Sequence, residues 1–327
     1  MSCNITRQLV HAVHGCYTPG HSKRADKFNP AIDTSWKIYS STSRRDMLDM
    51  AKDFGGFLRE HFPDLTRASR ISPDNIQAYI NAKAATCVDA TLGKIMSRVG
   101  KLEVCCRHAY SGERDTFAWH VKGVTTPSST KNADFVKDTP VPLEVSKTIL
   151  ATLSEKRSSE VGNAVTLSAY AGMRANETTC LKVKNITFYG GEFGFGYITI
   201  AKGPEGGAKG GRPRVIPILN QESQDAIKSV IAGKQSEDYV AAKSDGTKMT
   251  PDNVQRSMRE VMDKQFGHTY KGNRNHGMRK AWAQRYYDVV RNGGCTRKQA
   301  VEKINEVLGH GSKRGEEMVR MYVAKIW

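Results

Sequence analysis

The sequence lacks any long hydrophobic run, since no stretch of 18 apolar residues occurs and no secretory signal is apparent. A membrane-spanning helix needs about 20 such residues, so no membrane association is expected. Acidic residues are also scarce, with 33 Asp and Glu against 50 Lys and Arg, which leaves a net charge of +17. So large a basic excess indicates a polyanionic partner, and nucleic acid is favoured over a membrane surface.

Cysteine motifs are missing as well. The seven cysteines form no CxxC pair, which favours a reducing cytoplasm over a disulfide framework. One small zinc site can be imagined, from Cys3, His11, His14 and Cys16 with His21 beyond. Its spacing matches no common zinc finger, and incidental placement is the favoured reading. We therefore expect neither a metal nor a cofactor.

The chain length of 327 residues allows two domains. The first 42 residues have little apolar periodicity but carry several cations, which predicts an extended or loosely folded basic arm; the cations are Lys23, Arg24, Lys27 and Lys37. The predicted segments are this arm (1–42), a helical block (43–112), a polar linker (113–139) and a second domain (140–327).

Apolar spacing predicts three helices in the helical block, at about 44–61, from Ser72-Pro73 onward, and from about Asp89 to Tyr110. Ser72 can cap the second helix, and Pro73 fits its first turn. The third helix carries a basic face made of Lys94, Arg98, Lys101 and Arg107. That face is either a solvated surface or a DNA contact, and both interpretations stay open.

The second domain is expected to be mainly helical with one small antiparallel sheet. Helices are predicted from about residue 142, at about 159–173 and from residue 221 onward, including a capped helix at 296–308. Three β-prone segments, at 185–188, 197–200 and 214–218, are separated by glycines. A long glycine-rich hairpin tip joins the second segment to the third.

Three separated motifs carry the candidate chemistry. They are Ala171-Gly-Met-Arg-Ala-Asn-Glu177, His276-Gly-Met-Arg279, and Leu308-Gly-His310 followed by Tyr322. Each motif alone is weak, because an isolated arginine, histidine or late tyrosine is usually surface or packing. In this order, with a lysine on the intervening hairpin, they resemble the tyrosine recombinase family of phage-type integrases. The resemblance runs from about residue 44 to the C-terminus.

The resemblance implies a helical core-binding domain and a mainly helical catalytic domain that clamp DNA from opposite sides. It also implies a homotetramer acting on double-stranded DNA with specific recombination sites. Accessory DNA-bending or directionality factors are possible partners. The implied role is integration or excision of a mobile element, in the cytoplasm and on the bacterial nucleoid.

The residue types suit cleavage of a phosphodiester without a metal. Arg174 and Arg279 can neutralise the charge that develops on a pentacoordinate phosphorus. Tyr322 is the candidate nucleophile, but with an ordinary pKa near ~10 it needs help from a base or a positive field. His276 and His310 can supply that help. The resemblance makes His276 the base and gives His310 a hydrogen bond to the phosphate, while the residues alone leave their shares open.

The leaving 5′ oxygen needs a proton. The resemblance points to Lys202, at the end of a predicted strand, and Lys209 in the hairpin tip is the rival. Glu177, one turn after Arg174, resembles an acidic residue that supports the arginine, although a surface glutamate is the alternative. Lys209 and Arg212 are further candidates for DNA contact.

Two departures from the family pattern concern the end of the chain. Eleven residues separate His310 from Tyr322, a few more than is usual, and we expect a lengthened turn followed by a short helix from Glu316 to Tyr322. The final Ile326-Trp327 can dock on its own domain or on a neighbouring protomer. A type IB topoisomerase-like enzyme and a catalytically silent DNA-binding protein of the same fold are the alternative functions.

Overall fold

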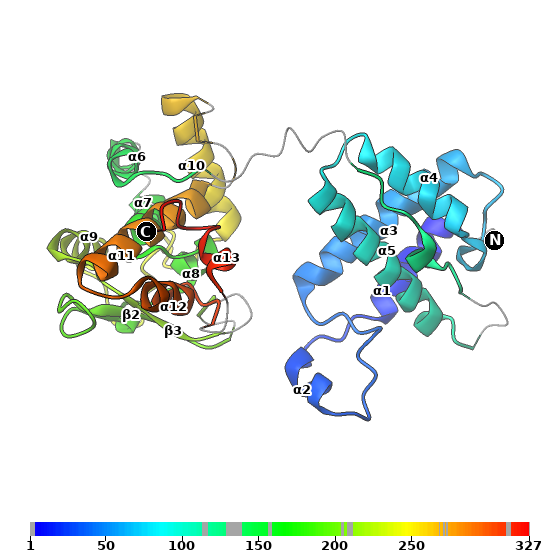
Figure 1. Cartoon of the computed structure of the whole chain (residues 1–327), viewed down its shortest axis with the longest axis horizontal. Coiled ribbons are helices and arrows are strands. Elements are labelled where there is room, and N and C mark those ends of the chain that lie inside the picture. Colours follow the sequence, from blue (N-terminus) through cyan, green and yellow to red (C-terminus); the bar gives the residue numbers. More distant parts are fainter. Residues whose placement is uncertain are drawn as a thin grey trace. The chain divides into compact units, whose positions relative to one another are not determined.

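The computed structural model describes residues 4–112, 117–128, 139–155, 159–203, 206–207, 212–267, 269–270, 272, 274–311 and 315–326. The chain divides into two compact units, Met1–Phe135 and Val136–Trp327, and each has its own hydrophobic core (Figure 1). Within the described ranges, no helix combines the length and the apolar character needed to cross a bilayer.

In the described part of the first unit, the regular elements are helices. Its α-helices are α1 (Ile5–Gly15), α2 (Lys23–Phe28), α3 (Ser41–His61), α4 (Pro73–Ala84) and α5 (Asp89–Ala109), with 3-10 turns at Ala68–Arg70 and Val121–Gly123. The three helices predicted for the helical block are confirmed as α3, α4 and α5. Ser72 caps α4 as expected, since its side chain and that of Asn75 each bond the other's backbone N–H.

The expected extended arm is wrong for residues 5–15, which form helix α1. Ile5, Leu9 and Val13 recur every four residues and are buried against α3 and α5. The helices lie close together at Gly55 of α3, where an added Cβ would fall 2.6 Å from Thr6 Oγ1. Because the apolar stripe covers only three turns, its partners in α3 and α5 are what reveal it as part of the core.

The expected linker is also too long at its start. Trp119 is fully buried in the core of the first unit, and its indole N–H donates to the Ala68 carbonyl over 2.8 Å. Phe117 and Val121 are buried beside it. A fully buried tryptophan removes a large apolar surface from water, so residues 117–124 belong to this unit rather than to a connection. The rest of the predicted linker, apart from residues 125–128 and 139, lies outside the described residues.

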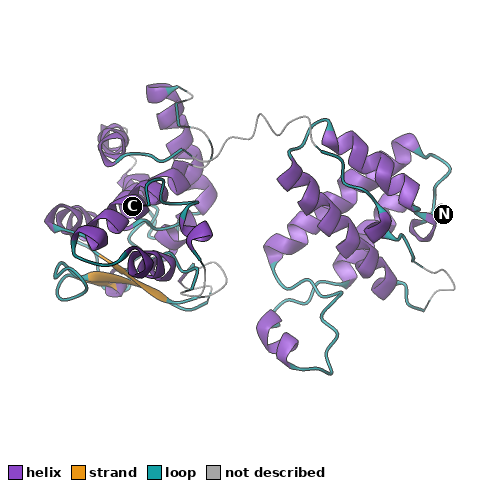
Figure 2. Cartoon of the chain, viewed as in Figure 1, coloured by secondary structure: helices purple, strands orange, loops and turns teal. Residues whose placement is uncertain are grey.

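The second unit places a small sheet among many helices, as Figure 2 shows. Its elements are α6 (Leu143–Glu155), α7 (Ser159–Ala171), α8 (Ala175–Cys180), η4 (Val183–Asn185), β1 (Ile186–Thr187), β2 (Tyr197–Ile200), β3 (Arg214–Pro217), α9 (Gln221–Ile231), α10 (Pro251–Phe266), α11 (Arg274–Asn292), α12 (Arg297–Val307) and α13 (Glu316–Val319). The strands pair antiparallel in the order β1-β2-β3. The predicted fold class, mainly α with a small antiparallel sheet, is confirmed.

Helices α7 and α11 run through the core of the second unit. In α11, Trp282 stacks on Tyr286 with ring centroids 5.4 Å apart, and Tyr287 is also fully buried. The Tyr286 hydroxyl donates to Glu192 over 2.8 Å. These two tyrosines are therefore packing residues. Near the C-terminus of the chain, Ile326 packs against the same core, while Trp327 lies outside the described residues.

Candidate active site

A sharp turn between two helices positions Arg174. Helix α7 ends at Ala171, and Gly172 follows with a φ of +61°. A side chain is excluded there twice over, because this φ is strained for L-residues and an added Cβ would lie 2.4 Å from the Trp282 ring. Helix α8 begins three residues later, and the Arg174 N–H donates to the Glu177 carboxylate over 2.8 Å. The turn thus presents Arg174 at the start of a new helix.

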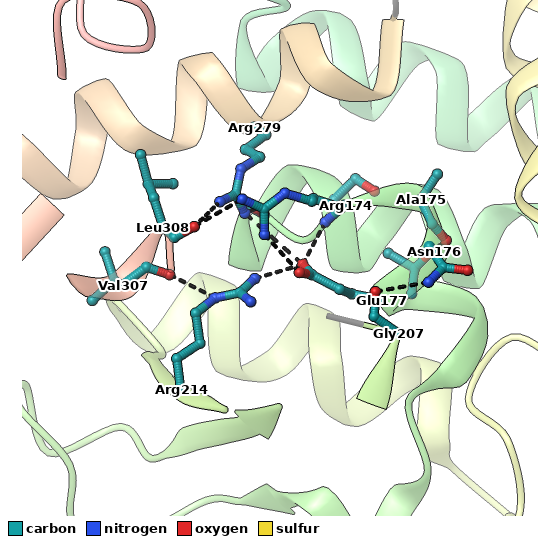
Figure 3. Close-up of polar contacts among 12 residues, drawn as sticks. Arg174, Ala175, Asn176, Glu177, Gly207, Arg214, Arg279, Val307 and Leu308 are labelled. Atoms are coloured by element: carbon teal, nitrogen blue, oxygen red, sulfur yellow. Dashed lines mark hydrogen bonds and ion pairs between the residues drawn. The ribbon is translucent and has the colours of Figure 1, made fainter. Parts of the chain in front are cut away.

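Glu177 is the centre of a buried charge cluster. Its carboxylate lies 2.8 Å from Arg174 Nη1, 2.5 Å from Arg214 Nη2 and 3.9 Å from Arg279 Nη1 (Figure 3). The side chains of Glu177, Arg214 and Arg279 are 0%, 3% and 1% exposed. Three guanidinium groups therefore surround one carboxylate, and the cluster keeps a net positive charge.

The protonation of this cluster follows from its surroundings. Burial by itself would raise the pKa of Glu177, but the guanidinium groups, Arg214 foremost, hold this pKa at about 2. For Arg279, burial and then the charge of Arg174 lower the pKa, while Glu177 acts in the opposite direction. An arginine starts so far above neutrality that Arg279 stays charged. The Glu177 carboxylate and the Arg279 guanidinium are therefore both ionised at neutral pH.

The end of α12 fixes the direction of the arginines. The Leu308 carbonyl accepts from Arg174 Nη2 at 2.9 Å and from Arg279 Nη2 at 2.7 Å, and the Val307 carbonyl accepts from Arg214 Nε at 2.8 Å. Arg279 also donates to the Gly172 carbonyl over 2.5 Å. Carbonyls at a helix C-terminus lack intrahelical partners and carry partial negative charge. They hold the guanidinium groups in place before any ligand arrives.

Tyr322 lies beside this cluster. Its ring centroid is 5.0 Å from those of both His276 and His310, and Arg279 Cζ is 5.7 Å from the ring centre. The tyrosine is half-buried. Helix α13 ends at Val319 rather than at Tyr322, because the last backbone bonds belong to a turn, in which the Tyr322 N–H donates to the Val319 carbonyl. The long spacer still delivers Tyr322 to both histidines.

The hairpin cations lie differently from one another. Lys202 lies two residues after the end of β2 and is exposed, outside the group of side chains that bond Glu177 or surround Tyr322. Arg212 is exposed too, and its Nη1 donates to the His310 carbonyl over 3.0 Å. Lys209 lies outside the described residues. Arg212 therefore contacts His310, whose ring lies beside Tyr322, whereas Lys202 makes no such contact within the described residues.

Arg214 is the residue that the motifs did not reveal. It begins β3, and strand alternation places it on the same face as the buried Ile216, while Val215 between them is exposed. A charged residue in phase with buried strand residues indicates a paired charge in the core. That alternation was the available signal, although the partner Glu177 is 37 residues away.

Comparison with known proteins settles the family. The sequence pattern described as "Phage integrase family" matches residues 142–325, which is more than half of the chain. The chain belongs to the phage integrase family. No curated protein matches this integrase-family chain in sequence.

Solved structures with a similar fold are those of tyrosine recombinases and integrases. They include a XerH recombinase bound to a palindromic difH substrate (13% identity, TM-score 0.62, 99% of this chain and 93% of that one). A lambda integrase dimer bound to a COC′ core site (16%, 0.59, 91% and 75%) and the Tn1549 transposon integrase with a circular intermediate DNA (13%, 0.54, 97% and 95%) are similar as well. At these identities, the likeness establishes the fold of the integrase-family chain.

Most of the basic face predicted on α5 has partners within the protein. Arg98 pairs with Asp46 at 2.6 Å, Arg107 pairs with Glu103 at 3.3 Å, and the Lys101 ammonium donates to the Ser35 carbonyl. Lys94 is exposed. Arg98, Lys101 and Arg107 therefore each make a contact within the first unit of the integrase-family chain.

The candidate zinc residues have other surroundings. Cys16 is buried, and its thiol donates to the Cys105 carbonyl over 3.6 Å. His14 Nδ1 lies 2.9 Å from Arg44 Nη2, and Cys3 lies outside the described residues. In the described part of the chain, no three His, Cys, Asp or Glu side chains gather closely enough to hold a metal ion.

Proposed function

We propose that this chain is a site-specific DNA recombinase, an integrase that cleaves and rejoins double-stranded DNA through a 3′-phosphotyrosyl intermediate. One observation carries the proposal. Tyr322 lies beside His276, His310 and Arg279. The Arg279 guanidinium shares the Leu308 carbonyl with that of Arg174. A candidate nucleophile thus lies close to two candidate bases and to a pair of arginines that share one acceptor.

In the proposed reaction, the Tyr322 hydroxyl oxygen attacks the scissile phosphorus. The P–O3′ bond is kept, the new P–O(Tyr) bond forms and the P–O5′ bond breaks. His276 takes the tyrosine proton, and His310 donates a hydrogen bond to a phosphate oxygen. The leaving 5′ oxygen takes a proton and becomes a hydroxyl. A 5′ hydroxyl from a partner strand then reverses these steps, so the phosphodiester energy is conserved in the covalent link.

Arg174 and Arg279 stabilise the charge on the pentacoordinate phosphorus. Each guanidinium can direct two N–H groups at phosphate oxygens. Their bonds to the Leu308 carbonyl and to Glu177 fix them in advance, which reduces the reorganisation that the transition state requires. Each Nη2 nitrogen carries a second N–H, which a phosphate oxygen can accept while the bond to the Leu308 carbonyl is kept.

We assign the proton for the leaving oxygen to Lys202. It lies two residues after the end of β2, close to the paired strands of the sheet. Its exposed side chain leaves it accessible to a bound duplex. Lys209 is the competing assignment, and comparing Lys202→Ala with Lys209→Ala decides between them. On a substrate whose 5′ oxygen is replaced by sulfur, which leaves without a proton, the true acid variant regains cleavage.

The wider proposal gives the first unit to core-site binding and the second to catalysis. The chain would act as a homotetramer on two recombination sites, with Lys94 and Arg212 among its DNA contacts, and would integrate or excise a mobile element on the bacterial nucleoid. Accessory DNA-bending or directionality factors belong to the same proposal. Its support is the family membership and the net charge of +17.

A nicked suicide substrate tests the function directly. Duplexes tiled across the DNA that flanks the gene, each nicked just beyond a candidate cleavage position, trap a covalent adduct when the short cleaved strand diffuses away. The wild-type chain should form an adduct on the strand's 3′ phosphate, and Tyr322→Phe should form none. Tyr189→Phe, at an exposed tyrosine, is the matched control and should react as wild type.

The alternative functions give other results in the same experiment. Adducts that persist in Tyr322→Phe would refute the nucleophile assignment. Relaxation of supercoiled plasmid without paired sites, and without recombinant product, would favour a type IB topoisomerase-like enzyme. Specific binding with no adduct on any bound duplex would favour a catalytically silent DNA-binding protein.

A further inference from the structure

A loop at residues 17–38 stands out from the first unit and includes the short helix α2 (Figure 1). We propose that this loop is a second DNA-contacting element, in which Lys23 and Lys27 bind the phosphate backbone of duplex DNA and Phe28 contacts the adjoining sugars. The inference rests on the proposed DNA-binding function and deepens it. It also assigns the DNA contact to residues other than Lys101, because the Lys101 ammonium is bonded to the Ser35 carbonyl.

The base of the loop is held firmly. Its two ends meet where the Thr18 N–H donates to the Ile38 carbonyl over 2.9 Å and the Ile38 N–H donates to the Cys16 carbonyl over 2.8 Å. Near the end of the loop, Trp36 stacks on His108 of α5, with ring centroids 3.6 Å apart and an angle of 7° between the ring planes. The loop is therefore fixed on α5 and is not a loose tail.

Lys101 is part of this anchor. Its ammonium donates to the Ser35 carbonyl, so a cation that the sequence suggested for DNA holds the loop in place. Burial lowers the pKa of Lys101, and the positive charge of Lys23 lowers it further. Lys23 is therefore near enough to Lys101 to act on it electrostatically.

The loop separates its charges. Asp26, the acidic residue of α2, is buried and accepts from Lys37 at 2.8 Å and from Tyr39 at 3.0 Å. The Lys37 hydrogen bond lowers the pKa of Asp26 and keeps it ionised, so these two charges cancel inside the loop. Lys23 and Lys27 are exposed. The outward surface of α2 is thus positive although its sequence contains an aspartate.

Phe28 adds an apolar contact beside the two lysines. It ends α2 and is 77% exposed, among the most exposed large hydrophobic side chains of the described residues. Exposed cations beside an exposed aromatic ring fit a DNA backbone, where phosphates alternate with apolar sugar faces. A protein partner with acidic residues is the competing occupant. The overall charge of +17 favours the polyanion.

The salt dependence of DNA binding tests the proposal in the full-length chain. Each phosphate contact contributes about 0.9 to the slope of log K against log salt. Lys23→Ala/Lys27→Ala should therefore reduce this slope by about two and weaken binding to specific and non-specific duplexes alike. Phe28→Ala should weaken binding with the slope unchanged, because the ring carries no charge.

The matched control removes the same charge from α3. Lys52→Ala/Arg59→Ala changes two exposed cations in the same unit and should keep a slope near that of wild type. Thermal unfolding should be unchanged in all these variants. A wild-type slope for Lys23→Ala/Lys27→Ala would overturn the proposal. The proposal would also be overturned if Lys23→Ala/Lys27→Ala differed from wild type in sedimentation coefficient but not in DNA binding. That result would assign the loop to a protein partner.

The test remains separate from the proposed chemistry. Tyr322→Phe should bind DNA with the wild-type slope and form no adduct. If wild type binds DNA but cleaves none, the recombinase proposal fails while the loop can still be measured. If it binds no DNA at all, both fail together, and that result is recognisable before any loop variant is made.

Discussion

Arg214 and Glu177 form an ion pair at 2.5 Å although both side chains are almost completely buried. Glu177 also bonds the side chain and the backbone N–H of Arg174. A buried ion pair tolerates loss of one partner poorly, because the remaining charge stays out of water. Glu177 is therefore the residue on which the placing of the arginines depends, and its removal should be costly.

Glu177→Gln should lower the free energy of unfolding by roughly 3–5 kcal/mol, the usual cost of breaking a buried pair. The amide keeps the shape but leaves three guanidinium groups without a counter-charge. Urea unfolding measures the change. Glu237→Gln is the matched control, because Glu237 is an exposed partner of Lys182 and Lys184, and it should lower the free energy of unfolding far less than Glu177→Gln does. Equal losses in the two variants would contradict the buried cluster.

The same carboxylate predicts a pH dependence. The pKa of Glu177 falls from its ordinary 4.5 to about 2 on folding. Its contribution to stability is therefore complete above about pH 4.5 and is lost as the pH falls toward 2. The difference in unfolding free energy between wild type and Glu177→Gln should narrow over that interval. A constant difference from pH 6 to pH 2.5 would show that the folded carboxylate titrates normally.

Arg174→Lys and Arg279→Lys should each slow adduct formation by about a hundredfold or more, the typical loss for one preorganised donor. Lysine keeps the charge but cannot share the Leu308 carbonyl while directing a second N–H at a phosphate. Single-turnover cleavage at saturating protein separates this effect from binding. Arg256→Lys, at an exposed position of α10, should leave the rate unchanged. A less than fivefold loss in both site variants would remove the arginines from the chemistry.

Gly172→Ala should destabilise the second unit by roughly 2 kcal/mol or more. The positive φ opposes a side chain, and the new methyl would meet the Trp282 ring at 2.4 Å. Gly162→Ala in α7 is the contrasting control, because no atom lies within 4 Å of its added Cβ and alanine favours a helix. Thermal unfolding should shift in opposite directions. A stable Gly172→Ala variant would mean that the turn before Arg174 can relax.

The sequence by itself determined the three helices α3, α4 and α5, the three strands and the order of the chemical motifs. Those features are local, because apolar periodicity and caps such as Ser72 act within a few residues. The family followed from the same information, since the order of Arg174, His276, Arg279, His310 and Tyr322 can be read without any contact.

Only the tertiary structure decided which residues share a site. Arg174 meets the Leu308 carbonyl 134 residues away, Arg214 meets Glu177 across 37, and Lys101 reaches Ser35 across 66. Burial has the same long-range origin, so α1 and Trp119 seemed to lie outside any core until α3, α5 and Ala68 were placed beside them. The free energy of a charge or an aromatic ring depends on its neighbours in space, and periodicity along the chain does not specify them.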